Sequence, residues 1–552
     1  MATTTATASP VHHSRIAGRA LPGVGGERPV VSPATGEPFA SVSLLGAEQL
    51  DQAFAAAEAA FPAWSGLEVH ERTRYLERLR HILVDEARAL AELIAREQGK
   101  PVAEAHAVEI FPVLESLRHL ERHAPDQLRE EPLESEVLLL AHKRGRLRYE
   151  PYGTVLVISP WNYPLAIPVP AVAAALAAGN VVLLKPAPAT TLVALRIAEL
   201  ADAAGLPPGV LSVLALDDAL AASLVASPRV GKIVFTGSVP TARKVMAAAA
   251  PNVTSLVLEL GGKDPAIVLR DADLDRAAQG IVWGAFMNAG QTCASVERLY
   301  VEAPVADALT ERIVAGARSL RVGDPLDAEV DIGPMTLERQ RRIVEEHVAD
   351  ALERGAELLS GGERLPGPGF YYPPTVLARV DHGMRIMREE SFGPVLPIQV
   401  VDGPEQALQL ANDSPYGLTA SIWTRDAELA SRLERGLRAG VVTLNDLLYS
   451  YGDPAVPFGG FKQSGFGRTH GLAGLREMVQ VKLVSRDWGR RPMLWWFPYG
   501  PELTKLLVHS HVALYGRSLL RRLASQLRLL TFRRFLRRVS LLDVAKNVDR
   551  LF

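Results

Sequence analysis

The strongest constraint on the fold is a series of short, uninterrupted apolar segments that alternate with helical ones. Residues 154–158 and 181–184 are almost entirely apolar, and the Ala-rich stretch 168–178 between them is followed by Gly179. Glycine commonly terminates helices. The same alternation continues along the chain at residues 192–204, 210–214 and 232–235. Strands that are apolar on both faces need helices on both sides, so the sequence predicts an α/β fold built on a parallel sheet.

Other parts of the 552-residue chain fit the same class of fold. Helical patterns rich in Ala and Leu cover residues 47–63 and 70–98. A hairpin is predicted at 137–149, with its first strand at 137–141. A second alternation of strands and helices extends from about residue 266 to residue 442.

Composition and charge exclude several classes of protein. Apolar residues make up 48% of the chain and charged residues 22%, which is typical of a globular protein. Lys plus Arg number 60 and Asp plus Glu 62, so the formal net charge is −2 and no nucleic-acid partner is predicted. No stretch of about 18 uninterrupted apolar residues occurs, which argues against a transmembrane helix.

Residues 1–28 are predicted to form a disordered tail. The first residues are rich in Thr, Ala and Ser and lack the apolar core that a secretory signal needs. Arg15 and Arg19, with no acidic residue before Glu27, leave a transit peptide as the alternative.

The chain has a single cysteine, Cys293, in the segment Asn288-Ala-Gly-Gln-Thr-Cys293. A lone cysteine excludes an internal disulfide and any multi-cysteine metal site, so no metal centre is predicted. It also fits a reducing, cytoplasmic location. The glycine before it would let the backbone bend and leave the thiol accessible as a nucleophile. Free cysteines are also among the most frequently buried residues, so an inert core position is the alternative.

Two further polar residues directly follow predicted strands, where α/β proteins place ligands and catalysis. Glu259 follows the apolar run 256–258 and could act as a general base if it is partly desolvated, or it could be a solvated loop carboxylate. Asn162 lies in Pro160-Trp-Asn-Tyr-Pro164, and its side-chain amide could stabilise an oxyanion. Asn is also common in turns and helix caps, which is the simpler interpretation.

A third group of residues could bind a phosphate. Lys185 ends the predicted strand 181–184, and Gly237-Ser238 lies between another strand and a helix that begins near Val239. A helix N-terminus offers free N–H groups and a positive dipole to a phosphate. No G-x-G-x-x-G follows an early strand, so the usual dinucleotide fingerprint is absent.

Taken together, these motifs resemble the aldehyde dehydrogenase superfamily over about residues 30–485. Seven motifs occur in the order found in that family, and Glu259 and Cys293 stand the required 34 positions apart. The motifs are Pro160-Trp-Asn-Tyr-Pro164, Lys185-Pro186, Phe235-Thr-Gly-Ser238, Glu259-Leu-Gly-Gly-Lys263, Gly290-Gln-Thr-Cys293, Glu390-Ser-Phe-Gly-Pro394 and Pro457-Phe-Gly-Gly460. The resemblance implies a parallel-sheet cofactor domain, a catalytic α/β domain and a bridging β arm that joins subunits into homodimers or homotetramers.

The resemblance also implies roles for individual residues. Cys293 would attack the aldehyde carbon, and the Asn162 side chain and the Cys293 backbone N–H would hold the oxyanion. Glu259 would activate the water that hydrolyses the resulting thioester, and its presence favours hydrolysis over transfer to coenzyme A. The cofactor would be NAD or NADP. The residues that would hold it are Trp161, Lys185, Gly237, Ser238, Glu390 and Phe392.

Position 188 bears on the choice between the two cofactors. NAD-preferring members of the family commonly carry a Glu three residues after the Lys, and Pro188 stands there instead. No carboxylate is then present to repel a 2′-phosphate, but Pro188 offers that phosphate no donor. Both NAD and NADP are therefore expected to bind.

The aldehyde is less constrained. By analogy with the family, aromatic residues would line the substrate tunnel and favour an apolar, aromatic or long-chain aldehyde. These residues are Tyr163, Trp283, Phe286 and Phe458. The stretch Cys293-Ala-Ser-Val-Glu-Arg298 and the C-terminal tail also resemble a bacterial succinate-semialdehyde dehydrogenase branch, whose substrate would need a cationic anchor. A catalytically silent structural or membrane-associated family member is the alternative of another class, and the three catalytic candidates argue against it.

Residues beyond about 487 form a basic extension outside the resemblance. Between Glu502 and Asp543 there is no acidic residue, and nine residues are Lys or Arg. At 100° per residue, one apolar stripe consists of Leu519, Leu520, Leu523, Leu527 and Leu530. A second stripe, after a break near Thr531, consists of Phe532, Phe535, Leu536 and Val539. We expect peripheral contact of residues 493–542 with an anionic membrane, packing on the enzyme or a neighbouring subunit, or disorder.

These patterns divide the chain into five parts. They are the N-terminal tail at 1–28, the cofactor-binding domain at 29–133 and 151–260, the oligomerisation arm at 134–150 and 474–487, the catalytic domain at 261–473, and the C-terminal basic amphipathic extension at 488–552. The expected location is cytoplasmic, with the extension offering peripheral membrane contact.

Overall fold

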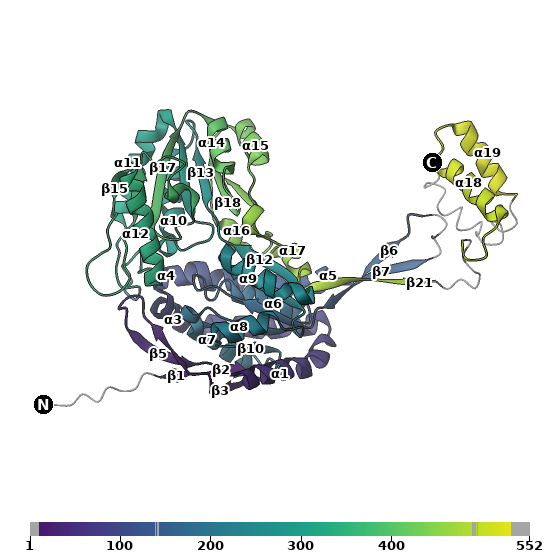
Figure 1. The fold of residues 1–552 in the computed structure, drawn as a ribbon, viewed down its shortest axis with the longest axis horizontal. Helices are drawn as coiled ribbons and strands as arrows, with labels where there is room; N and C mark the ends of the chain where they lie inside the picture. The colour runs from purple at the N-terminus through teal and green to yellow at the C-terminus, as the bar shows by residue number, and fades with distance from the viewer. Residues whose placement is uncertain (1–9, 138–139, 141–142, 488–492, 494, 532–552) are drawn as a thin grey trace. The chain divides into compact units, whose positions relative to one another are not determined.

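The computed structural model describes residues 10–137, 140, 143–487, 493 and 495–531. The chain divides into two compact units. The first comprises Met1–Gln127 and Pro151–Gln480, and the second comprises Leu128–Glu150 and Val481–Phe552 (Figure 1). The first unit contains two large sheets, and the catalytic candidates all belong to it.

The first large sheet has eight strands in the order β20-β12-β11-β8-β9-β10-β2-β3. Its parallel centre confirms the predicted alternation. The central strands are β12 (Ser255–Leu260), β11 (Lys232–Gly237), β8 (Thr154–Ile158), β9 (Val181–Lys185) and β10 (Leu211–Val213). The connecting helices include α6 (Pro168–Ala177), α7 (Thr191–Ala203) and α9 (Val239–Ala249). Four of the five residues of β8 and of β9 are buried, because helices cover both faces.

The second large sheet has seven strands in the order β15-β16-β17-β14-β13-β18-β19. All neighbouring pairs are parallel except the edge pair of β15 (Glu357–Ser360) and β16 (Thr375–Ala378). The other strands are β17 (Val395–Val401), β14 (Val296–Glu302), β13 (Asp264–Val268), β18 (Thr419–Trp423) and β19 (Val441–Leu444). Helices α10 (Leu274–Phe286) and α11 (Ala306–Ser319) belong to the same region. The second predicted alternation is thus confirmed.

The N-terminal third contributes a group of helices to the first unit. The predicted helix at 47–63 is α1 (Ala47–Ser65), whereas the pattern at 70–98 forms two helices, α2 (Val69–Asp85) and α3 (Ala87–Gln98). They are followed by the π-helical turn η1 (His106–Ile110) and by α5 (Phe111–Gln127).

The prediction of a disordered tail over residues 1–28 is wrong for residues 10–28. These residues form β1 (Val11–His12), β2 (Ser14–Ile16), β3 (Arg19–Leu21) and the start of β4 (Glu27–Val31), which pairs with β5 (Pro38–Ser43). Strand β2 extends the first large sheet beside β10, and the Ser14 hydroxyl accepts a bond from the Ala215 amide. The pairing partner lies about 200 residues away, so no local pattern indicates it. Residues 1–9 lie outside the described residues.

The predicted domain boundaries also shift. Strand β20 (Gly465–Phe466) falls in the predicted catalytic domain but pairs with β12 in the first large sheet, opposite Leu258 and Glu259. Residues 474–480, which we assigned to the arm, belong to the first unit together with α17 (Gly471–Arg476).

The second unit contains a three-stranded sheet in the order β21-β7-β6. The strand that pairs with β7 (Arg144–Pro151) is β6 (Glu131–Glu134), which precedes the predicted first strand at 137–141. Residues 138, 139, 141 and 142 lie outside the described residues. The strand expected near 478–484 is β21 (Val479–Arg486).

Two helices follow in the second unit. Helix α19 (Leu519–Leu529) confirms the first predicted amphipathic segment, whereas α18 (Pro501–Tyr515) was not predicted. The second predicted stripe, at 532–539, lies outside the described residues. Within the described part of the chain, no helix combines the length and the apolar character needed to cross a bilayer.

Candidate active site

Cys293 lies in a sharply bent segment between α10 and β14, and it is half-buried. Asn288, Ala289 and Gly290 all have positive φ, of 54°, 50° and 69°. This left-handed conformation is uncommon for residues that carry a side chain. A Cβ atom at Gly290 would lie 2.1 Å from the carbonyl oxygen of Gly393. The approach to Cys293 is therefore bent and tightly packed against a neighbouring loop.

A buried polar network holds this bent segment. The Gln98 side-chain amide donates to Asn288 Oδ1 and to Thr336 Oγ1, at 2.9 Å each. The Thr336 backbone N–H donates to Gln291 Oε1 at 2.9 Å, and the Gln291 amide donates to the Asn288 carbonyl at 2.9 Å. Because these groups are buried, losing one partner would leave another polar group without a hydrogen bond. This cost holds the backbone before Cys293 in place.

Asn162 meets the cysteine segment directly. Its Nδ2 donates to the Gln291 carbonyl at 2.9 Å, and the Asn288 side-chain amide donates to the Asn162 carbonyl at 2.9 Å. The next residue, Tyr163, shares a 2.7 Å hydrogen bond with the Thr292 hydroxyl. The loop after β8 and the loop before β14 are thus joined, although they are about 130 positions apart in the sequence.

A fully buried ion pair supports the Asn162 loop from behind. Lys100 Nζ lies 2.7 Å from Glu109 Oε1 and also donates to the Asn162 carbonyl at 3.1 Å. The second oxygen of Glu109 accepts the backbone N–H groups of Leu165 and Ala166, at 3.0 and 2.7 Å. Neither residue is predicted from the sequence, because a Lys and a Glu near helical segments are typical of surface charges.

A second buried ion pair supports the opposite side of the site. Lys263 Nζ lies 2.6 Å from Glu297, whose two oxygens accept the backbone N–H groups of Ser391 and Phe392, at 2.9 Å each. The neighbouring Glu390 accepts the Gly262 N–H at 3.1 Å. Glu297 is not predicted from the sequence, since nothing in its local pattern distinguishes it.

Close neighbours explain the two glycines of the Glu259-Leu-Gly-Gly-Lys263 motif. A Cβ atom at Gly261 would lie 2.4 Å from Glu390 Oε2, and one at Gly262 would lie 2.6 Å from the Cys293 carbonyl oxygen. A side chain at Gly262 would therefore displace backbone, whereas one at Gly261 would displace the Glu390 carboxyl group.

The residues predicted to hold a nucleotide lie at the carboxyl ends of adjacent parallel strands. Lys185 ends β9, Gly237 ends β11, and Trp161 follows β8 and meets Phe392 edge-to-face at 5.4 Å between ring centroids. Ser238 is the N-cap of α9 and makes no capping bond through its side chain. An ammonium group and the free N–H groups of a helix N-terminus form a donor set that suits the phosphates and ribose hydroxyls of a dinucleotide.

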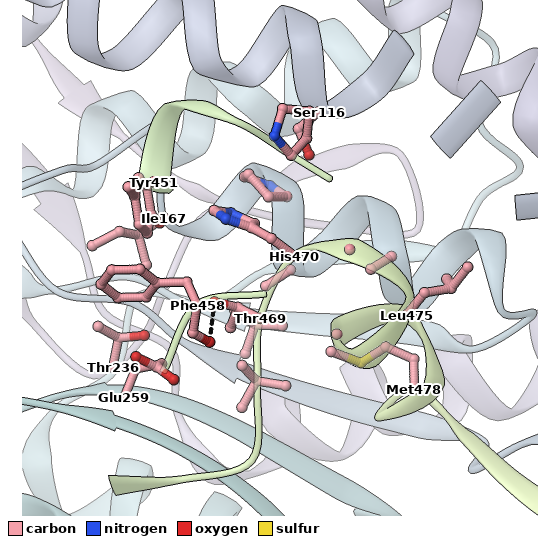
Figure 2. Close-up of a pocket in the computed structure, with 18 of the residues that line it drawn as sticks. Ser116, Ile167, Thr236, Glu259, Tyr451, Phe458, Thr469, His470, Leu475 and Met478 are labelled. Carbon is pink, nitrogen blue, oxygen red and sulfur yellow. Dashed lines mark hydrogen bonds between the residues drawn. The ribbon is translucent and has the colours of Figure 1, made fainter. Parts of the chain in front are cut away.

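Cys293 and Glu259 line one cavity, which is otherwise mostly apolar. Figure 2 shows Glu259 in the wall of this cavity. Other lining residues are Leu120, Val157, Ile167, Val234, Tyr451, Phe458, His470, Leu475 and Met478. Among the described residues, no Lys or Arg lines this cavity. A terminal carboxylate of a substrate would therefore find no cation there.

The structure supports only one of the four predicted tunnel residues in this cavity, namely Phe458. Tyr163 is buried, with its ring 3.8 Å from Lys100 Nζ, and it is not among the lining residues. Trp283 and Phe286 line a different hollow between α10 and α11. A role of these three residues in the substrate tunnel therefore stays a prediction, and none of them lines the cavity that contains Cys293.

Burial controls the charges in the cavity. Desolvation raises the pKa of Glu259 well above its ordinary value, although the charge of Arg468 acts in the opposite direction. Glu259 Oε1 is buried and has no hydrogen-bond partner within the described part of the chain. Desolvation also raises the pKa of the Cys293 thiol, with a smaller contribution from Glu259. Burial therefore favours the neutral thiol of Cys293 and the protonated form of the Glu259 carboxyl group.

No group of three or more His, Cys, Asp or Glu residues among the described residues is arranged to hold a metal ion. The parallel sheet carries hydrogen-bond donors that suit a nucleotide, and a cysteine and a carboxyl group share one cavity. These features are typical of a nucleotide-dependent α/β enzyme.

Comparison with known proteins identifies the family. A sequence model of the aldehyde dehydrogenase family matches residues 22–484. The chain is 38% identical over 463 residues to the succinate semialdehyde dehydrogenase (NAD(P)+) Sad of Escherichia coli K12, covering 83% of this chain and 97% of that protein. It is 40% identical over 437 residues to the 4,4'-diapolycopene aldehyde oxidase of a Methylomonas species, covering 79% and 81%.

Solved structures agree with this result. The crystal structure of an NAD-dependent aldehyde dehydrogenase from Sinorhizobium meliloti superposes with a TM-score of 0.84 at 37% identity, covering 88% of this chain and 96% of that one. The chain therefore belongs to the aldehyde dehydrogenase family and is an NAD(P)-dependent oxidoreductase. The predicted fold class and family are both confirmed.

The packing of Gly290 leads to a test of the cysteine segment. We expect Gly290→Ala to reduce kcat/KM at least tenfold and to lower the unfolding temperature, because its Cβ would clash with the Gly393 carbonyl and displace Cys293. Gly355→Ala is the matched control, since Gly355 also has positive φ but has no atom within 4 Å of a built Cβ. Equal effects of the two substitutions on activity would contradict this interpretation.

Proposed function

We propose that this enzyme oxidises apolar or aromatic aldehydes to carboxylic acids through a covalent intermediate on Cys293. The observation that carries the proposal is the cavity shared by Cys293 and Glu259, which is apolar and has no Lys or Arg among its described lining residues. A binding site for succinate semialdehyde would leave the substrate's carboxylate buried and unpaired, which is costly. This chemistry favours an uncharged aldehyde.

The first step is attack by Cys293 on the aldehyde carbon. The thiol must first lose its proton, which passes to solvent water, and burial makes that loss unfavourable. The negative charge then moves to the former carbonyl oxygen. Of the two N–H bonds of the Asn162 side chain, one is used by the Gln291 carbonyl. The other N–H and the Cys293 backbone N–H are the proposed oxyanion donors.

The proposed cofactor-binding residues are Lys185, Ser238, Gly237, Trp161, Glu390 and Phe392. When bound, NAD(P)+ supplies the hydride acceptor that converts the thiohemiacetal on Cys293 into a thioester. Lys263 and Glu297 hold the Phe392 loop in position for this step through the backbone N–H groups of that loop.

Glu259 completes the reaction in this proposal. Its carboxylate would take a proton from a water molecule, which attacks the thioester and releases the carboxylic acid and the Cys293 thiol. The unpartnered Oε1 atom is consistent with a group that takes up and releases protons in a dry cavity.

The role of Glu259 predicts a specific kinetic change. Glu259→Gln should still release a burst of about one NAD(P)H per site, followed by turnover roughly 100-fold slower than wild type, because only hydrolysis needs the base. Because burial raises the pKa of Glu259, wild-type turnover should rise as pH increases through that pKa. Stopped-flow absorbance at 340 nm measures both phases. Loss of the burst itself would show that Glu259 acts in an earlier step.

The names of the relatives do not settle the substrate, since proteins of similar identity are named for succinate semialdehyde and for a 4,4'-diapolycopene aldehyde. We expect kcat/KM for benzaldehyde or a medium-chain alkanal to exceed that for succinate semialdehyde by at least 100-fold, because the cavity lacks a cation. The assay is NAD(P)H formation with each cofactor in turn. Cys293→Ala should abolish it. A preference for succinate semialdehyde would contradict the proposal.

The homodimer or homotetramer expected from sequence stays a prediction. Strand β21 is the edge of the three-stranded sheet in the second unit, and its Val481 and Leu483 side chains are exposed. An exposed apolar edge strand is a surface on which a strand of another copy can pair.

We also propose that α19 contacts an anionic membrane. Helix α19 packs on α18 through Ser525 and Leu529, while its leucine stripe is left exposed, with Leu520 at 79%. Arg521 and Arg528 lie on the same helix and form no ion pair with any described residue. A helix with an exposed apolar stripe and basic flanks is typical of peripheral membrane proteins.

Vesicle flotation tests this contact. Full-length protein should float with vesicles containing anionic lipid and not with neutral ones, and L520Q/L527Q should reduce the floated fraction about tenfold by removing apolar area from the stripe. Val400→Gln is the control, since Val400 is also exposed but belongs to β17. Equal flotation with both lipids would contradict the proposal. A change in subunit number caused by L520Q/L527Q would show instead that the stripe packs on another subunit.

A further inference from the structure

His470 lines the same cavity as Cys293 and Glu259, yet the proposed reaction does not use it (Figure 2). It directly follows Thr469, whose backbone exchanges two hydrogen bonds with Phe458, at 2.8 and 2.9 Å. Its own carbonyl accepts the Gly474 N–H at 2.8 Å, as the N-cap of α17. The backbone bonds between Thr469 and Phe458 on one side, and helix α17 on the other, therefore hold His470 in position.

The backbone of His470 adopts a conformation that is unfavourable for any residue with a side chain. Its φ is 61° and its ψ is 164°, a combination that is essentially restricted to glycine. Such strain persists only where the surrounding structure imposes it, and it concentrates at functional sites. The imidazole of this strained residue lies in the wall of the cavity.

The His470 ring carries a hydrogen-bonding atom that the protein leaves unused. Its Nδ1 atom is buried and has no hydrogen-bond partner among the described residues. The ring meets Tyr451 edge-on, with centroids 4.7 Å apart. Burial lowers the pKa of His470 to about 4, with the charge of His119 acting in the same direction and Asp453 opposing it. At neutral pH the imidazole is therefore uncharged, and it can pair with a neutral polar group.

Two residues of α5 add polar atoms near the same part of the cavity. Ser116 lines the cavity and is buried. His119, one helical turn further on, has a buried Nε2 atom without a partner in the described part of the chain. Other lining residues, including Leu120 and Ile167, are apolar. The cavity thus combines an apolar wall with a small group of neutral hydrogen-bonding side chains.

We propose that His470, together with Ser116, binds a hydroxyl group of the aldehyde substrate, at a position away from the reacting carbonyl. A hydroxyl both donates and accepts, so it can pair with either tautomer of a neutral imidazole. A site that buries an unused polar atom also discriminates against analogues that lack the matching group. This inference rests on the proposed function and narrows its substrate class to hydroxylated apolar aldehydes.

Matched aldehyde pairs test the inference. The aromatic pairs are benzaldehyde with 3-hydroxybenzaldehyde and with 4-hydroxybenzaldehyde, measured below neutral pH so that the phenol stays protonated. The aliphatic pair is hexanal with 6-hydroxyhexanal. In the wild type, kcat/KM should be about tenfold higher for the hydroxylated member of at least one pair. The pair that shows the preference distinguishes an aryl from an alkyl hydroxyl.

The variants assign this preference to the imidazole. His470→Phe should bring the ratio within each pair to about one, and His470→Asn, which keeps a donor and an acceptor, should retain part of it. The kcat/KM for the unhydroxylated member should stay within about threefold, as expected for a residue that does not act on the reacting atoms. His81→Phe is the control, because His81 is exposed.

Several results would overturn the inference. No preference for any hydroxylated aldehyde in the wild type would do so, as would a preference that survives His470→Phe. If His470→Phe does not fold, competitive inhibition of the wild type by p-cresol and by toluene replaces it, with an expected inhibition constant about tenfold lower for p-cresol. Equal constants would overturn the inference. Oxidation of benzaldehyde and hexanal without any hydroxyl preference refutes the inference alone, whereas oxidation of no aldehyde refutes the proposed function as well.

Discussion

Two buried lysine–glutamate pairs hold the active-site loops, and the geometry of the site depends on them. In each pair the ammonium neutralises the carboxylate, and the carboxylate accepts backbone N–H groups from a loop. Glu109 holds the loop that carries Asn162, and Glu297 holds the loop that carries Glu390 and Phe392. Removing one partner of a buried pair typically costs about 3–5 kcal/mol, because a charge is left without compensation. Loss of either lysine would therefore also weaken the hydrogen bonds by which its glutamate holds the loop.

The burial that surrounds these ion pairs also excludes water from the cavity, and this determines the chemistry of the cavity. Where lysines compensate the carboxylates, buried charge is stable. At Glu259 and Cys293 desolvation outweighs the other influences, including the opposing charge of Arg468 on Glu259, so it raises both pKa values and favours the neutral forms. A cavity with neutral groups and apolar walls suits an uncharged substrate. Protonation behaviour and substrate class thus share one physical cause, the removal of this region from water.

The sequence predicted best those features that depend on nearby residues. The central strands of the first sheet and the helices α1, α6 and α19 occur where the apolar patterns place them. Features that depend on partners far away in the chain were not predicted. Strand β2 forms beside β10 although nothing around Ser14 indicates a strand, and Trp283 and Phe286 face a different hollow from the one that contains Cys293. An apolar pattern shows that a side chain is buried, but not which neighbour buries it.

From the order and spacing of its motifs, the sequence alone identified the family and named Cys293, Glu259 and Asn162 as the residues to examine. These motifs can be recognised in the sequence because each is short and its own glycines and prolines determine its local backbone conformation. The tertiary structure decided what surrounds those residues. It brought Lys100 to Glu109 and Lys263 to Glu297, kept cations out of the cavity, and imposed a strained backbone on His470. Burial and pairing arise from contacts between distant segments, so they exist only once the chain has folded.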